Sequence, residues 1–284
     1  MADTFEFIRY GGVTKGVAHL ALARPEKRNA QSKAMLYELN DALDLACHDN
    51  ECKVIMLSAD GPDFSSGHDM KDREPMNHDP VGTWGGFTQP GIEGHWAFEE
   101  EVYLGFCWRW RNIPKPTIVQ VQGRVIAGGL MLVWPFDIII ASEDARFSDP
   151  VVAFGVNGVE YFAHPWEVGV RKAKEMLFTG EAITADEAKT LGMVNHVVSR
   201  EELEDFSTNM AEHIAKQPMV GLKLAKQSVN QMQDAQGLWP ALQAAMSLQH
   251  MGHAHERLIH QSAVEPEGEA KIKQQAKKEK PNKF

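Results

Sequence analysis

The chain has 284 residues, of which 43% are hydrophobic and 24% charged, and its formal net charge is -10 at pH 7. This length and composition allow a large buried core and indicate an ordinary globular protein. The negative charge argues against a nucleic-acid-binding surface, because phosphate binding depends on Lys and Arg.

The ends and cysteines of the chain suggest its compartment. Residues 1–6 lack the basic patch and apolar stretch of a secretion signal, and no apolar run reaches the roughly 20 residues that span a bilayer. Cys47, Cys52 and Cys107 form no Cys-x-x-Cys pair, so a disulfide framework is not expected. We expect a cytoplasmic protein with no membrane span.

The first half of the chain alternates apolar strand patterns with a helical one. Residues 17–22 predict a strand that ends before Pro25, and residues 53–59 predict a second, doubly buried strand. Between them Ser32 is a candidate N-cap for a helix. Its apolar residues recur at spacings of three and four, at Leu36, Leu39, Leu43 and Ala46.

A long irregular segment follows. Residues 73–94 are rich in Gly and Pro, which predicts either a pocket lid or a disordered insertion. Further strands are predicted at 117–121 and 137–141, separated by a glycine-led helical segment. The pattern indicates an α/β domain.

The last third of the chain is predicted to be helical. Thr184 and Glu187 form a capping-box pattern for a helix that Gly192 can end. We expect an α/β core over residues 1–200, a helical trimerisation subdomain over 201–263 and a flexible, Lys-rich tail over 264–284. Alternatively, some tail lysines reach a phosphate of a ligand.

Two glycine-containing junctions are the candidate sites for chemistry. Residues 64–70 and 123–132 each follow a predicted strand, where glycine lets backbone amides point into a cleft. Gly128 and Gly129 would open a helix, whose first amides lack internal partners and favour an anion. Such glycines can equally serve packing alone.

Several motifs together resemble the signature blocks of the enoyl-CoA hydratase/isomerase (crotonase) family. They follow the family's order over roughly residues 5 to 200. The blocks are Arg-Pro-Glu-Lys-Arg-Asn-Ala (24–30), Phe-Ser-Ser-Gly-His-Asp-Met-Lys (64–71), Lys-Pro (115–116), Val-Gln-Gly (121–123), Ala-Gly-Gly (127–129), Asp-Ile-Ile-Ile-Ala (137–141), Ala-Arg-Phe-Ser-Asp-Pro (145–150), 179–188 and 191–198.

This resemblance implies a crotonase-type spiral of ββα units with a C-terminal helical subdomain, assembled as a homotrimer or a dimer of trimers. It implies an acyl-CoA thioester as partner and no cofactor beyond the coenzyme A moiety. By resemblance, the amides of His68 and Gly128 form the oxyanion hole. Coenzyme A contacts carry over, on the same basis, to Arg28, Ala30, Ser66, His68 and Met70.

The sequence departs from the family at its acid/base positions. Family hydratases use two glutamates, at positions that here hold Met131 and Val151, and neither side chain carries a titratable proton. Related enzymes place a carboxylate farther along, which points to Glu160 as the acid/base residue. Asp149 and His164 are weaker candidates, with a turn-capping Asp and a packing His as the alternative readings.

No metal site is predicted. His250, His253, His255 and His260 share a helical stretch without a zinc motif, and we interpret them as a histidine-bearing helix face. Nucleotide-binding glycine motifs are also absent from the sequence. Trp84, Phe87 and Trp96 suggest an apolar pocket wall, although core packing explains aromatic residues equally well.

Two hypotheses remain. One is an enoyl-CoA hydratase/isomerase-like enzyme working through an enolate with non-standard acid/base residues. The other is a non-catalytic acyl-CoA-binding protein on the same scaffold. Met131 and Val151 favour the binding protein, and Glu160 favours the enzyme.

Overall fold

The computed structural model describes residues 5–74, 78–82 and 85–278. Its strands are β1 (Ile8–Thr14), β2 (Val17–Leu22), β3 (Val54–Ala59), β4 (Thr117–Val121), β5 (Arg124–Ile126), β6 (Ile138–Ser142), β7 (Arg146–Ser148), β8 (Ile183–Thr184) and β9 (His196–Val198).

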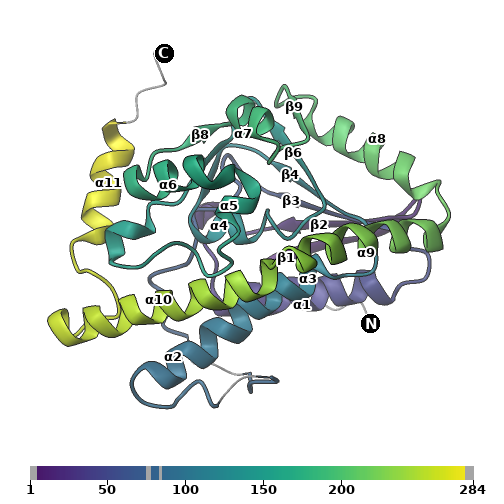
Figure 1. The fold of residues 1–284 in the computed structure, drawn as a ribbon. Helices are drawn as coiled ribbons and strands as arrows, with labels where there is room; N and C mark the ends of the chain where they lie inside the picture. Colours follow the sequence, from purple (N-terminus) through teal and green to yellow (C-terminus); the bar gives the residue numbers. More distant parts are fainter. Residues whose placement is uncertain (1–4, 75–77, 83–84, 279–284) are drawn as a thin grey trace.

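The helices alternate with these strands and then dominate the C-terminal third (Figure 1). The α-helices are α1 (Lys33–His48), α2 (Ile92–Phe98), α3 (Phe106–Arg111), α4 (Gly128–Met131), α5 (His164–Glu167), α6 (Gly169–Thr179), α7 (Ala185–Leu191), α8 (Leu203–Ala215), α9 (Met219–Ala235), α10 (Leu238–His260) and α11 (Gly268–Lys278). A π-helical segment, η2 (Glu99–Gly105), and two 3-10 turns, η1 (Pro25–Lys27) and η3 (Val151–Phe154), complete the set.

The larger sheet has the strand order β1-β2-β3-β4-β6-β9, with β1 antiparallel and the remaining pairs parallel. Its strands alternate between two apolar layers, so Ile55 and Leu57 face the layer containing α1, whereas Val54 and Met56 face α8. Figure 1 shows the sheet between these two helices. Burial of both faces explains why the strands read as near-continuous apolar runs.

A smaller sheet, β5-β7-β8, runs beside the first. β4 is followed by β5 and β6 by β7, and β5 and β7 pair in parallel. After β3, Ser65 bridges Val125 of β5 in the same way. Successive turns of the chain therefore place one segment in each sheet, which confirms the predicted spiral of ββα units.

The local signals predicted for helix ends are confirmed. Ser32 Oγ accepts a hydrogen bond from the Met35 amide at 3.3 Å, and Thr184 Oγ1 accepts one from the Glu187 amide at 3.1 Å. Gly192 ends α7 in the left-handed conformation, with φ of 90°.

The C-terminal region is helical as predicted, but the segment predicted to be a flexible tail contains α11. Gly268 begins this helix against the Phe154 ring, where a Cβ atom would lie 2.5 Å from Cδ1, and the Glu265 amide donates to Phe154 O at 2.9 Å. Composition alone did not reveal this helix, because a distant aromatic side chain supplies its packing. Among the described residues, no helix has the length and apolarity to cross a membrane.

Candidate active site

A cavity of about 550 Å³ lies where the spiral core meets α10 and α11. Five of the seven predicted site residues line it together: Arg28, Ser66, His68, Met70 and Glu160. Ala30 and Gly128 are not among the lining residues, although Ala127, next to Gly128, is. The structure thus brings most of the predicted site into one place.

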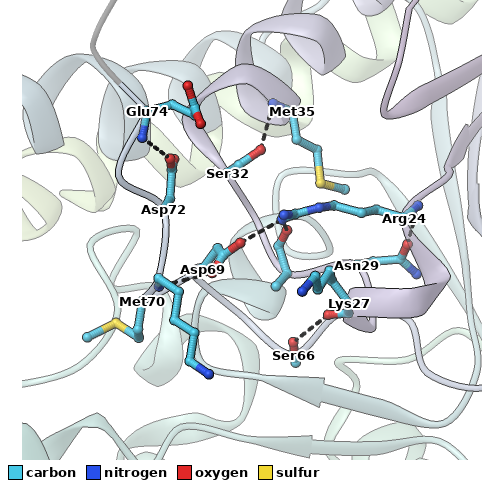
Figure 2. Close-up of polar contacts among 12 residues, drawn as sticks. Arg24, Lys27, Asn29, Ser32, Met35, Ser66, Asp69, Met70, Asp72 and Glu74 are labelled. Carbon is cyan, nitrogen blue, oxygen red and sulfur yellow. Dashed lines mark hydrogen bonds and ion pairs between the residues drawn. The ribbon is translucent and has the colours of Figure 1, made fainter.

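A polar network fixes the segment that carries His68 (Figure 2). Arg24 Nη1 donates to Asp69 Oδ2 at 2.8 Å and to Ala30 O at 2.9 Å. Gln31 pairs with this segment in parallel, donating to Gly67 O at 2.8 Å and accepting from the Asp69 amide at 2.9 Å. These bonds use the neighbours of His68 and leave its own amide unused.

The backbone amides of His68 and Gly128 have no hydrogen-bond acceptor among the described residues. The segments that carry them are closely apposed, since a Cβ atom on Gly67 would lie 3.3 Å from Gly128 N. Gly67 has φ of 87°, and Ala127 has φ of 48° with ψ of -117°, a conformation that alanine adopts rarely. Two unused amides beside strained backbone fit an anion-binding site.

The imidazole of His68 covers Gly128. A Cβ atom on Gly128 would lie 2.6 Å from His68 Cε1, so only glycine leaves room for the ring. The opposite face of the imidazole stacks on Tyr103, with 4.1 Å between centroids. The ring of His68 is thus held between Gly128 and Tyr103.

Glu160 is the carboxylate partner of this imidazole. Its side chain is 6% exposed, and its Oε2 lies 3.2 Å from His68 Nε2. Burial by itself lowers the pKa of His68, but the charge of Glu160 and the hydrogen bond to it outweigh burial, so the His68 pKa is raised. Glu160 is therefore a buried carboxylate and not a surface one.

Asp149 and His164 support the loop that carries Glu160. Both side chains are fully buried, with His164 Nε2 at 2.8 Å from Asp149 Oδ2, and the same oxygen accepts from the Val159 amide at 2.9 Å. Neither residue lines the cavity. They match the alternative readings of a turn-capping Asp and a hydrogen-bonded packing His.

Met131 is 2% exposed in the main core, whereas Val151 lines the cavity. Neither side chain can exchange a proton, and of the two only Val151 contributes apolar surface to the cavity.

Neither described residue of the predicted aromatic wall lines the cavity. Trp96 stacks on His250, and Phe87 lines a separate depression. Trp84 lies outside the described residues. Tyr103 and Phe154 supply the aromatic surface instead.

Of the described residues of the predicted lid, 73–94, only Arg73 lines the cavity.

A second group of titratable side chains faces the cavity and was not predicted from the sequence. It consists of Glu99 at the start of η2, His95 on α2 and His253 on α10. His95 Nε2 lies 2.7 Å from Glu99 Oε1, and His253 Nε2 lies 3.6 Å from the same oxygen. The four-residue spacing of His95 and Glu99, which places both on one helix face, was the available signal.

Comparison with known proteins agrees with this geometry. The family model for enoyl-CoA hydratase/isomerase matches residues 12–264. The chain belongs to the enoyl-CoA hydratase/isomerase family.

Individual relatives cover most of the chain. EchA13 of Mycobacterium tuberculosis, provisionally named an enoyl-CoA hydratase, is 44% identical over 260 residues, covering 88% of this chain and 82% of the relative. The 1,2-epoxyphenylacetyl-CoA isomerase of Escherichia coli is 32% identical over 223 residues, covering 77% and 80%. A crystal structure of a provisionally named enoyl-CoA hydratase from Mycobacterium smegmatis superposes with a TM-score of 0.83 at 45% identity, covering 91% of this chain and 99% of that one.

These relatives bear the names of both hydratases and isomerases, so family membership indicates an enzyme without selecting a reaction. It also supports the spiral architecture seen in the two sheets.

Proposed function

We propose that this family member is an enoyl-CoA hydratase/isomerase-like enzyme that forms and protonates the enolate of an acyl-CoA thioester. One observation carries the proposal: the buried Glu160 carboxylate lines the same cavity as His68 and lies 3.2 Å from its Nε2, and the ring of His68 lies against Gly128.

The oxyanion hole would be formed by the amides of His68 and Gly128. The thioester oxygen accepts hydrogen bonds from both, and they strengthen as negative charge develops on it. Preorganised donors of this kind each contribute on the order of 3 kcal/mol to transition-state stabilisation. Their lack of another acceptor among the described residues is consistent with this role.

The proton on the α-carbon would be exchanged by Glu160, with His68 holding the carboxylate in place. As the base removes that proton, the C–H electron pair moves toward the carbonyl and the enolate forms. The reverse transfer returns the proton. Glu160 Oε2 lies 3.2 Å from His68 Nε2, and Glu160 Oε1 accepts a hydrogen bond from Gln249 Nε2 at 3.3 Å, so contacts to both oxygens orient the carboxylate.

Coenzyme A would be held by the cavity walls nearest Arg28, Ser66 and Met70, with Ala30 contributing backbone beside them. Cationic side chains suit its phosphates, and Lys273 of α11 lines the same cavity as Arg28. This placement favours the reading in which a lysine of the C-terminal segment reaches a ligand phosphate.

The test uses a panel of saturated, 2-enoyl, 3-enoyl and aryl acyl-CoA thioesters, with products and α-deuterium exchange followed by mass. We expect Glu160→Gln to lower turnover at least about 100-fold while thioester affinity changes less than about threefold. Glu181→Gln, at an exposed position, is the matched control. Binding with neither turnover nor exchange across the panel would instead establish the non-catalytic acyl-CoA-binding protein.

A further inference from the structure

Three side chains of the kinds that bind metal ions meet where α10 ends and the chain turns toward α11. They are Glu256 and His260 of α10 and Glu265 of the segment that joins the two helices (Figure 1). One ligand atom from each lies within 4.8 Å of the others. Glu256 and His260 are four residues apart and therefore lie on one helix face, and the turn after His260 brings Glu265 to them.

Glu256 is the buried member of this group. It is 6% exposed, and its Oε2 has no hydrogen-bond partner among the described residues. Gly155, with φ of 81°, leaves room for the carboxylate, because a Cβ atom there would lie 2.2 Å from Glu256 Oε1. Buried charged groups in proteins are paired or coordinate a metal ion. The fold therefore holds in place an acceptor that needs a cationic partner.

His260 lies between the two carboxylates at distances that suit a shared metal ion. Its Nε2 is 3.7 Å from Glu256 Oε2 and 3.4 Å from Glu265 Oε2. Both distances exceed the roughly 2.7–3.2 Å of an N–H···O hydrogen bond. The centre of an equilateral triangle with edges of this size is about 2.0–2.1 Å from each corner, which is the length of Zn–N and Zn–O bonds. An ion thus fits between the three atoms without a further cavity.

The surroundings orient the ligands and leave access for the ion. Glu265 Oε1 accepts a hydrogen bond from the Glu267 amide at 3.3 Å, while its Oε2 faces His260. Hydrogen bonds to ligating carboxylates are typical around bound metal ions. The side chains of His260 and Glu265 are 35% and 25% exposed, so an ion reaches the buried Glu256 from their side. A water molecule on that side can complete a four-coordinate site.

A second group, His95, Glu99 and His253, also has ligand atoms within 4.8 Å of one another but does not suit a metal ion. His95 Nε2 lies 2.7 Å from Glu99 Oε1, which is a hydrogen-bond distance. Arg257 Nη2 lies 3.0 Å from His95 Nδ1, and a guanidinium can only donate. His95 Nδ1 is therefore the acceptor, its proton is on Nε2 facing Glu99, and no lone pair remains there for a metal ion.

We propose that Glu256, His260 and Glu265 form a structural site for a divalent transition-metal ion, with Zn²⁺ as the best match. One imidazole and two carboxylates in a four-coordinate arrangement suit Zn²⁺, whereas Mg²⁺ and Ca²⁺ prefer larger sets of oxygen ligands. The ion joins the end of α10 to the segment before α11. This inference goes beyond the proposed enolate chemistry and does not depend on it, because metal binding needs no substrate.

The bound ion fixes one wall of the acyl-CoA cavity. The Glu265 amide donates to Phe154 O at 2.9 Å, and Phe154 lines the cavity. Residues on both sides of Glu265 line it as well: Ser262, Ala263, Val264, Glu269, Ile272 and Lys273. A metal ion bound to Glu265 therefore holds the joining segment and α11 in the positions that close this side of the cavity.

The test titrates the full-length protein, first treated with a chelator, with Zn²⁺ in a calorimeter and follows amide hydrogen exchange peptide by peptide. For the wild type we expect one Zn²⁺ per chain and slower exchange over residues 261–278 when it binds. His260→Gln and Glu265→Gln each remove a ligand, so each should weaken Zn²⁺ binding at least about 100-fold and abolish the protection. His255→Gln, which removes an exposed histidine of the same helix, is the matched control and should behave as the wild type.

Several results would overturn the inference. Absence of Zn²⁺ binding to the wild type would leave His260 as a bridge between two carboxylates only. Unchanged Zn²⁺ binding in His260→Gln and Glu265→Gln would place the ion elsewhere, and protection over residues 92–105 that is lost in His253→Gln would place it at the Glu99 group. Displacement of Zn²⁺ by an equal concentration of Mg²⁺ would refute the assigned class of metal. The Glu160→Gln assays test the enolate proposal separately from all of these.

Discussion

Two different requirements favour glycine at position 128, and the sequence motif indicates only one of them. The motif suggested an amide donor, but the structure adds a steric requirement, because the His68 ring lies where a Cβ atom would be. Tyr103 packs against the opposite face of the His68 ring. The imidazole therefore cannot move away from Gly128 without losing its contact with Glu160. Gly128 therefore leaves space for the His68 ring in addition to the role proposed for its N–H.

Gly128→Ala is expected to displace His68, lower turnover by at least about 100-fold and cost about 1–3 kcal/mol of unfolding free energy through overpacking. The matched control is Gly82→Ala, where the glycine has no positive φ and nothing lies within 4 Å of the added atom. That change should alter the unfolding free energy by less than about 1 kcal/mol and leave activity unchanged. Turnover assays and denaturant unfolding check both, and wild-type activity in Gly128→Ala would contradict the placement of His68.

At the scale of the element, α10 is the back wall of the cavity. Gln249, His253 and Arg257 lie four residues apart on one face and contact Glu160, Glu99 and His95 in turn. Helix α10 thus orients the carboxylates of Glu160 and Glu99. Its packing against the rest of the protein depends on the charge of His253. Burial lowers the pKa of His253, but Glu99 and the carbonyl of Ala263 outweigh that effect and raise it.

The pH dependence of the unfolding free energy follows from the upward direction of the His253 pKa shift. A histidine whose pKa is raised on folding stabilises the protein fully below the unfolded value of about 6.5, and that contribution is lost as the pH rises through the folded pKa. Histidines with lowered pKa values, such as His19 and His250, do not change the unfolding free energy with pH above 6.5. We expect the unfolding free energy to fall from pH 6.5 to 8.5.

His253→Gln should reduce this slope and cost about 2 kcal/mol at pH 6, the scale of a hydrogen bond to a charged group. His68 contributes a remaining slope of the same sign, and so does Glu167, whose pKa burial raises to about 8. His255→Gln, exposed on the same helix, should leave the pH profile unchanged. Denaturant unfolding at several pH values checks this, and an unaltered slope in His253→Gln would show that His253 is not the group responsible.

At the scale of the whole molecule, α9 has no buried residue among its 17. Four of its large apolar side chains, Val220, Leu224, Val229 and Met232, are each at least 60% exposed. A helix with this pattern in a single chain requires a partner surface, and the trimer implied by the family resemblance would provide one.

We expect the wild-type protein to sediment as a trimer or a dimer of trimers, and Leu224→Glu to shift it toward the monomer. Gln227→Glu, which adds the same charge at an exposed polar position of α9, should not do so. Sedimentation velocity at micromolar concentrations measures the difference. A monomeric wild type would contradict the proposal.

Sequence reasoning succeeded where neighbours in the chain decide the outcome. The apolar runs of β3 and β4, the caps at Ser32 and Thr184 and the glycine turn before α4 all follow from local chemistry. The family motifs added Glu160, which the structure places on the cavity wall.

The remaining features depend on packing between distant segments. Glu99 lies near His253 only because α10 packs against the segment formed by α2 and η2. Helix α11 is packed against the rest of the protein because Gly268 contacts the Phe154 ring. From composition, residues 264–284 were predicted to be a flexible tail and the α10 histidines a histidine-bearing helix face, because no residue nearby in the chain pairs with them. The sequence by itself determined the fold, the family and the predicted oxyanion amides, because these rest on periodicity and contiguous motifs. Only the tertiary structure decided which titratable groups share the cavity, because a buried charge is set by the partners that folding brings to it.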